Sequence, residues 1–183
     1  MTTREPFEEP AEEGAFDDLP STDIDVENYI HFGMAGSFPL RLADLFFAED
    51  GLHIVEYSYI TVMFGLGTGK HRREAKAMKA VYDTHGIDEV RLRGDKSIWL
   101  NYGGIDRVVL DRGGGLGRPK LTVYAADGES YAYRVHESGG DGREDTAALL
   151  ADLEASAAAH DVELEVRDGF GFRPAESIHR FIR

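Results

Sequence analysis

The distribution of apolar and polar positions in the first half of the chain predicts a β-hairpin followed by a helix. Residues 40–60 form two β-rich runs joined across Asp50-Gly51, a pair favoured in tight hairpin turns. Residues 70–85 instead repeat apolar positions at helical spacing, and Gly86 stands where a helix commonly ends. Three further strand-like runs are expected at residues 89–93, 97–102 and 105–111.

The second half of the chain predicts another hairpin and a second helix. Residues 120–125 and 129–136 flank Asp127-Gly128, and Tyr131, Tyr133 and Val135 alternate as in a half-buried strand. Asp141 and Glu144 have the spacing of a capping box at the start of a helix. Residues 162–166 suggest a last short strand. The expected apolar face of this helix is Thr146, Leu149, Leu150, Leu153 and Ala157.

These elements predict an α+β fold. Antiparallel strands joined by Asp-Gly hairpins favour a curled sheet or barrel that is capped by the C-terminal helix. The helix at 70–85 is then an insertion between strands. We expect a single domain at residues 32–166, with a C-terminal tail at 167–183.

Charge divides the chain into unequal blocks. The formal net charge is −14, and residues 1–31 hold ten acidic residues and one basic residue. That N-terminal stretch is predicted to be a disordered acidic arm. Residues 70–120, by contrast, hold twelve basic and seven acidic residues. The strongly acidic total disfavours broad, non-specific binding to nucleic acids or anionic membranes.

The basic residues of the predicted helix form a stripe. At about 100° per residue, Arg72, Lys76 and Lys79 fall within about 60° of one another. The apolar positions lie on the opposite side: Ala75, Met78, Val81 and Tyr82. The stripe is a candidate contact for an anionic partner. The alternative is that these side chains pair with carboxylates of the same chain and contribute little. The candidate partner-binding residues are Lys70, Arg72, Arg73, Lys76, Lys79, Arg91 and Arg93.

Motifs for catalysis or cofactor binding are not recognised. The chain has no Cys, which excludes disulfides and thiolate metal sites. Gly65 and Gly69 are too close together for a phosphate-binding loop, and His71 follows Lys70 where that motif needs Ser or Thr. The seven His are scattered without a helical metal-binding pair. We therefore expect a protein that is not an enzyme, with no metal and no cofactor.

Composition adds an expectation about the cellular setting. The chain has five Lys against fifteen Arg, beside abundant Asp, Glu and Ala. This balance resembles the proteomes of halophilic archaea that accumulate salt, although an ordinary acidic cytosolic protein is the alternative. No apolar run approaches the roughly 20 residues of a membrane span, so we expect a cytoplasmic protein without a transmembrane segment.

Residues 38–166 resemble pleckstrin-homology-like and GRAM-like domains. The resemblance is carried by Trp99, Tyr102, Ile105 and Val108, which match a Trp-x-x-Tyr step followed by Ile-x-x-Val. It implies a docking or adaptor module. Lipid-binding members carry basic residues in the first hairpin loop, where this chain has Glu49 and Asp50.

The sequence therefore predicts a non-catalytic adaptor that binds a protein partner through its basic helix. The alternative is that the same basic residues contact a nucleic acid or an anionic lipid, with nearby aromatic residues stacking on the ligand.

Overall fold

The computed structural model describes residues 24–36, 40–60, 69–113, 118–136 and 143–168. The elements are β1 (Val26–Ala35), β2 (Leu40–Ala48), β3 (Gly51–Ile60), α1 (Lys70–Arg93), β4 (Lys96–Leu100), a short 3₁₀ turn η1 (Tyr102–Gly104), β5 (Ile105–Asp111), β6 (Lys120–Ala125), β7 (Ser130–Val135), α2 (Arg143–Ala159) and β8 (Glu163–Arg167).

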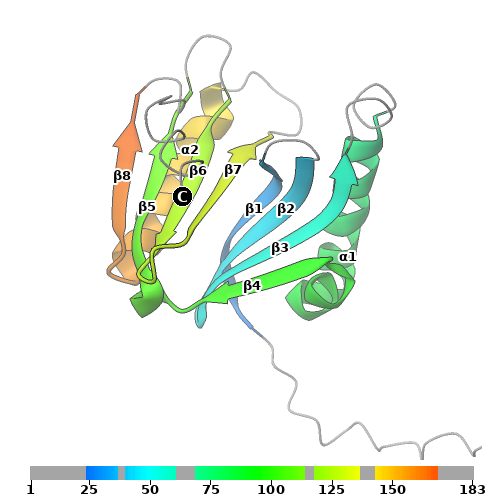
Figure 1. Ribbon diagram of the computed structural model, residues 1–183, viewed down its shortest axis with the longest axis horizontal. Coiled ribbons are helices and arrows are strands. Elements are labelled where there is room, and N and C mark those ends of the chain that lie inside the picture. Colours follow the sequence, from blue (N-terminus) through cyan, green and yellow to red (C-terminus); the bar gives the residue numbers. More distant parts are fainter. Residues whose placement is uncertain (1–23, 37–39, 61–68, 114–117, 137–142, 169–183) are drawn as a thin grey trace, which may run out of the picture.

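All eight strands belong to one sheet in the order β4-β3-β2-β1-β7-β6-β5-β8. Every neighbouring pair is antiparallel except β5 and β8, which are parallel. The sheet is strongly curled (Figure 1), and its end strands β4 and β8 do not pair with each other among the described residues. The predicted α+β class, with a mainly antiparallel curled sheet and a C-terminal helix, is confirmed. The barrel alternative is not, because the sheet stays open.

Two hydrophobic clusters explain the long apolar runs of β2 and β3. One cluster fills the inside of the curl and includes Leu45, Leu52 and Leu121, with Leu153 of α2 packed against them. The other lies on the opposite face of β1–β3, beneath α1. Strands that are covered on both faces bury almost every side chain, so β2 lacks the alternation of a half-exposed strand.

A buried carboxylate links the two halves of the sheet inside the curl. Glu56 of β3 accepts hydrogen bonds from Tyr133 Oη of β7 at 3.0 Å and from Arg41 Nη1 of β2 at 2.7 Å. Burial, followed by the charge of Glu56, raises the pKa of Tyr133, which therefore stays protonated and donates.

The predicted hairpins are both confirmed. β2 and β3 pair around Glu49 and Asp50, one residue before the predicted turn pair Asp50-Gly51, and β6 and β7 pair around Asp127 and Gly128. The second helix and the last strand are also present, as α2 and β8. Asp141 of the predicted capping box lies outside the described residues, as do residues 169–183 of the predicted tail.

Two predictions are wrong. The expected arm included residues 26–31, but β1 begins at Val26 and pairs with β2 from there, so the domain starts before residue 32. Residues 89–93 were expected to form a strand and instead belong to α1. The reason is that Ile87 and Val90, three residues apart, both turn into the cluster beneath the helix. Residues 1–23 of the arm lie outside the described part of the chain.

Candidate docking surface

α1 consists of two helical segments on the outer face of the sheet. It starts after Gly69, which has φ 66°, and bends at Gly86, whose φ of 76° and ψ of −172° are not helical. Gly86 was predicted to end the helix, but in the structure the helix changes direction at Gly86 and continues to Arg93. The positive φ explains why glycine stands there. The second segment ends at Gly94, whose N–H donates to the carbonyl oxygen of Val90 at 3.0 Å.

The buried side of α1 is the predicted one. Ala75 and Met78 of the first segment are buried against the sheet, and Val81 and Tyr82 pack beside them. The Tyr82 ring lies 4.5 Å from the Tyr29 ring, centroid to centroid. With this side fixed, the basic residues at the remaining positions face the solvent.

The candidate residues divide between the two segments of α1. Arg91 and Arg93 lie after the bend, and both are next to a carboxylate of the same helix: Arg91 Nη1 is 3.5 Å from Asp88 Oδ1, and Arg93 Nε is 2.8 Å from Glu89 Oε1. The remaining five lie in the first segment, which we call the cationic surface: Lys70, Arg72, Arg73, Lys76 and Lys79.

The cationic surface is only partly neutralised by its own chain. Lys79 Nζ lies 2.7 Å from Asp83 Oδ1, one turn further along the helix. Arg72 and Lys76 are exposed and have no carboxylate within ion-pair distance among the residues that the structure describes. The first turn contains no acidic residue, although carboxylates are the side chains that a helix N-terminus favours. The positive charge is therefore concentrated at the start of α1.

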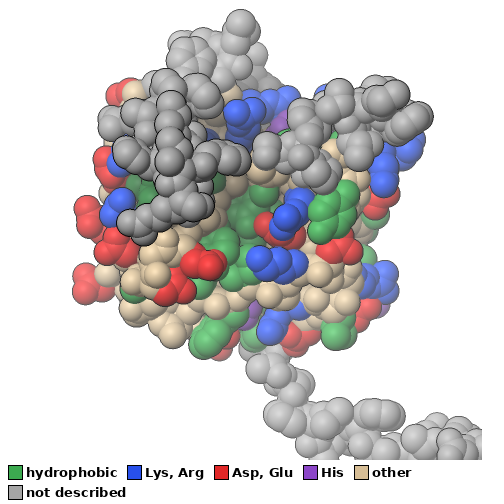
Figure 2. Space-filling model, in the orientation of Figure 1, with side chains coloured by type: hydrophobic (Ala, Val, Ile, Leu, Met, Phe, Trp, Pro, Cys, Tyr) green, Lys and Arg blue, Asp and Glu red, His purple; other side chains and the backbone are tan. Residues whose placement is uncertain are grey.

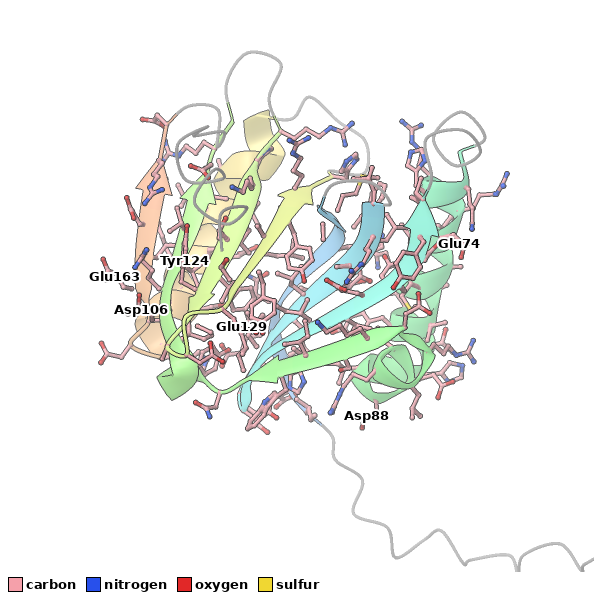
Figure 3. All side chains as sticks on the ribbon, in the orientation of Figure 1. Glu74, Asp88, Asp106, Tyr124, Glu129 and Glu163 are labelled. Atoms are coloured by element: carbon pink, nitrogen blue, oxygen red, sulfur yellow. The ribbon has the colours of Figure 1, made fainter. Side chains whose placement is uncertain are left out.

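The other basic residues of the 70–120 block are spread over several elements. Lys96 lies on β4 and Lys120 begins β6. Arg118, just before β6, contacts His136, whose ring lies 4.7 Å from that of Phe32. Figure 3 shows Tyr124, near the end of β6, on the opposite side of the molecule from Glu74 and Asp88 of α1. Figure 2 likewise shows Lys and Arg side chains at several separate places on this face. A single cluster of all twelve basic residues is not formed.

A buried carboxylate, which sequence reasoning missed, organises the sheet beneath α1. Asp44 of β2 is 0% exposed. It accepts hydrogen bonds from Tyr29 Oη at 2.8 Å, Tyr57 Oη at 2.9 Å and the backbone N–H of Phe32 at 2.9 Å, and His31 Nδ1 lies 3.1 Å away. A buried carboxylate is stable only when hydrogen bonds of this kind replace its hydration. The signal in the sequence was a lone Asp inside the apolar run 42–48.

The Asp44 contacts also hold an irregular point in β1. Phe32 has φ 61°, which is unusual for a bulky residue, and the register of β1 against β2 shifts between Ile30 and Gly33. Its N–H is held by Asp44, and its carbonyl oxygen accepts from the N–H of His136 at 3.0 Å. The Phe32 ring lies 6.0 Å from that of His71, at the start of α1. Asp44 thereby supports the place where the cationic surface begins.

The tyrosines around Asp44 make folding sensitive to alkaline pH. Burial, followed by the Asp44 charge, raises the pKa of Tyr29 and of Tyr57 far above the ordinary value of 10. Above about pH 10 the unfolded chain releases these protons and the folded chain keeps them, so stability falls by about 1.4 kcal/mol per pH unit for each proton retained. We expect the free energy of unfolding, measured with denaturant between about pH 9 and 11, to fall with this slope. Tyr57→Phe should make the slope shallower by the contribution of one proton. Equal slopes in the two proteins would contradict the assignment.

The described residues show no metal site and no membrane-spanning helix, and the crevice beside α2 is small. The crevice between α2 and the sheet, which includes Phe47, Tyr102 and Leu153, holds about 10 Å³, room for one water molecule. In the described part of the chain, no group of three or more His, Asp or Glu side chains could hold a metal ion. None of the described helices is long and apolar enough to cross a membrane.

Comparisons with known proteins add little to this picture. Neither a protein-family model nor a curated protein sequence matches the chain. Among solved structures, the chain aligns with the hSac2 domain from human phosphoinositide phosphatase Sac2, with a TM-score of 0.48 and 8% identity, over 82% of this chain and 80% of that chain. Similarity at this level transfers neither a binding partner nor an activity, and the pleckstrin-homology-like resemblance stays a prediction from the sequence.

Proposed function

We propose that this protein is a non-catalytic docking domain that binds an acidic segment of a partner protein through the cationic surface of α1. The observation that carries the proposal is the pair Arg72 and Lys76, both exposed and without an ion-pair partner among the described residues, in a chain of net charge −14. In so acidic a protein, carboxylates are abundant, and two exposed cations that have none beside them in the described chain favour an acidic ligand supplied from outside.

The support of α1 fits a rigid binding surface. The first segment is packed on Phe32, Tyr29 and Phe46, and the Tyr29 and Phe46 rings stack 4.6 Å apart at an angle of 4°. A partner that contacts this segment therefore binds side chains on an ordered helix, and binding loses little conformational entropy of the backbone. Arg91 and Arg93 are less suited to the role, because each already has a carboxylate beside it.

The first test compares three anionic probes by fluorescence anisotropy: a peptide rich in Glu, Asp and Phe, a single-stranded oligonucleotide, and vesicles containing phosphatidylserine. We expect the peptide to bind best. Reversing both charges in Arg72→Glu/Lys76→Glu should weaken its binding about tenfold, because two attractive contacts become repulsive. Binding should weaken further near 1 M salt, where screening leaves only direct contacts.

The matched control is Arg91→Glu/Arg93→Glu, which changes the net charge equally on the same helix. We expect it to keep the peptide affinity within about twofold, because those cations already have partners. The proposal is wrong if both double variants lose affinity equally, which would indicate a general charge effect. It is also wrong if the oligonucleotide or the vesicles bind more tightly than the peptide, which would favour the nucleic-acid or lipid alternative.

A further inference from the structure

The charge of the chain and the point where its N-terminal segment meets the domain suggest a regulator for this surface. We propose that residues 1–23 bind in cis to the cationic surface of α1 and compete with the partner, an inference that rests on the proposed function. Residues 1–23 contain eight acidic residues and one basic residue. Residues 70–79 contain five basic residues and one acidic residue. The two segments are therefore complementary in sign.

The described chain begins on the side of the sheet that α1 covers. Ile24 and Val26 pack against the same hydrophobic cluster as Met78 and Ile87 of α1. Glu27 of β1 also contacts the end of α2, with 2.8 Å between its Oε2 and His160 Nε2. Residues 1–23 therefore join the domain at a point of β1 that lies near both helices, and α1 is one of the two elements beside it.

The direction of β1 places the cationic surface within reach. Phe32 of β1 lies beside His71, and Tyr29 lies beside Tyr82, so β1 and α1 run in opposite directions. Position 24 therefore lies toward the later part of α1. From Tyr82 back to Arg72 the helix rises about 15 Å. Ile24 lies five residues before Tyr29, about 16 Å further along the chain, so the whole span is about 30 Å. Twenty-three residues can extend to about 75 Å, more than twice this distance.

Attachment to the domain makes a weak attraction sufficient. A tethered segment of this length has an effective concentration in the millimolar range at a surface it can reach. If the segment on its own would bind with a dissociation constant of about 0.1 mM, the tethered segment occupies about nine-tenths of the surface. A free acidic partner must displace the tethered segment, which lowers its apparent affinity by the occupied fraction. A higher concentration of the partner is then needed to occupy the surface than in the absence of the acidic segment.

The test uses the full chain, which has no native Cys, so a single Cys introduced at Ala11 (Ala11→Cys) carries one nitroxide label. We expect paramagnetic broadening of backbone amide signals in residues 70–80. The broadening should disappear near 1 M salt. It should also disappear in Arg72→Glu/Lys76→Glu and persist in Arg91→Glu/Arg93→Glu. Broadening that is absent, or that is unchanged by Arg72→Glu/Lys76→Glu, overturns the proposal.

A second measurement separates this proposal from the docking function. In Glu8→Gln/Glu9→Gln/Glu12→Gln/Glu13→Gln, the acidic peptide probe should bind about tenfold more tightly than to the unchanged chain. If both proteins bind the peptide equally, the cis contact is wrong and the docking function stands. If neither protein binds it while the label still broadens residues 70–80, the cis contact stands and the docking function is wrong.

Discussion

Replacing Asp44 with Ala is expected to lower the free energy of unfolding by about 3 kcal/mol. The change removes the acceptor of two tyrosine hydroxyls and one backbone N–H, all turned toward a fully buried site. Each donor that is left buried without a partner has a desolvation cost. Urea denaturation followed by circular dichroism measures the loss.

Two companion variants identify the cause. Asp106→Ala removes an exposed carboxylate that pairs with its neighbour Arg107, and should cost less than about 0.5 kcal/mol. Tyr57→Phe should cost about 1.5 kcal/mol in the native chain and close to nothing when Asp44 is already Ala, because its partner is then gone. An Asp44→Ala effect as small as that of Asp106→Ala would refute the role of the buried carboxylate.

The Gly51→Ala substitution is expected to cost about 3 kcal/mol, through the junction of β3 and β4. Gly51 has φ 143°, and a Cβ there would lie 2.4 Å from the carbonyl oxygen of Leu100 and 3.0 Å from Trp99 Nε1. Backbone atoms cannot move aside as a flexible side chain can. The edge strand β4 would therefore have to shift away from β3.

A second glycine separates the clash from the backbone strain. Gly128 also has a positive φ, of 89°, but a Cβ there would have no atom within 4 Å. Gly128→Ala should therefore cost only about 1 kcal/mol, the strain of the left-handed conformation. Denaturant midpoints of the two variants measure the difference. Equal costs would mean that close approach to Leu100 contributes nothing.

The hairpins and α2 could be predicted from the sequence because their signals are local. Asp50-Gly51 and Asp127-Gly128 mark turns between β-rich runs, and Leu149 and Leu153 recur one helical turn apart. β1 was not predicted from the sequence, and one reason is that its first residues continue the acidic composition of the preceding arm. Its pairing depends on β2 and on the distant β7, which no local pattern reveals.

The error at residues 89–93 has a different cause. Val90 and Leu92 alternate with charged residues as they would in a half-exposed strand, while Val90 also continues the helical spacing from Ile87. In so short a run, the strand period of two and the helical period of about 3.6 residues cannot be distinguished. In the structure the helix forms because the cluster beneath α1 buries both Ile87 and Val90. Leu92, by contrast, is 80% exposed.

The candidate surface was predictable in its residues but not in its extent. Helical spacing placed Arg72 and Lys76 on one exposed stripe. Arg91 and Arg93 differ from the stripe because a carboxylate lies beside each, three or four residues earlier on the same helix. These pairs were missed because residues 89–93 were predicted to form a strand, and a strand does not bring such positions together. The donors to Asp44 come from β1 and β3, so that network also required the tertiary structure.

The junction between β1 and β7 has a consequence for biosynthesis. Gly33 pairs with Val135, so the ribosome must add the intervening chain before the two halves of the sheet can join. Until then, the concave side of β1–β3 has nothing to cover its leucines, although α1 can already shield the other side. Contacts this distant in sequence slow folding. The nascent chain therefore passes through a stage in which this apolar surface is exposed to solvent and can bind chaperones or neighbouring chains.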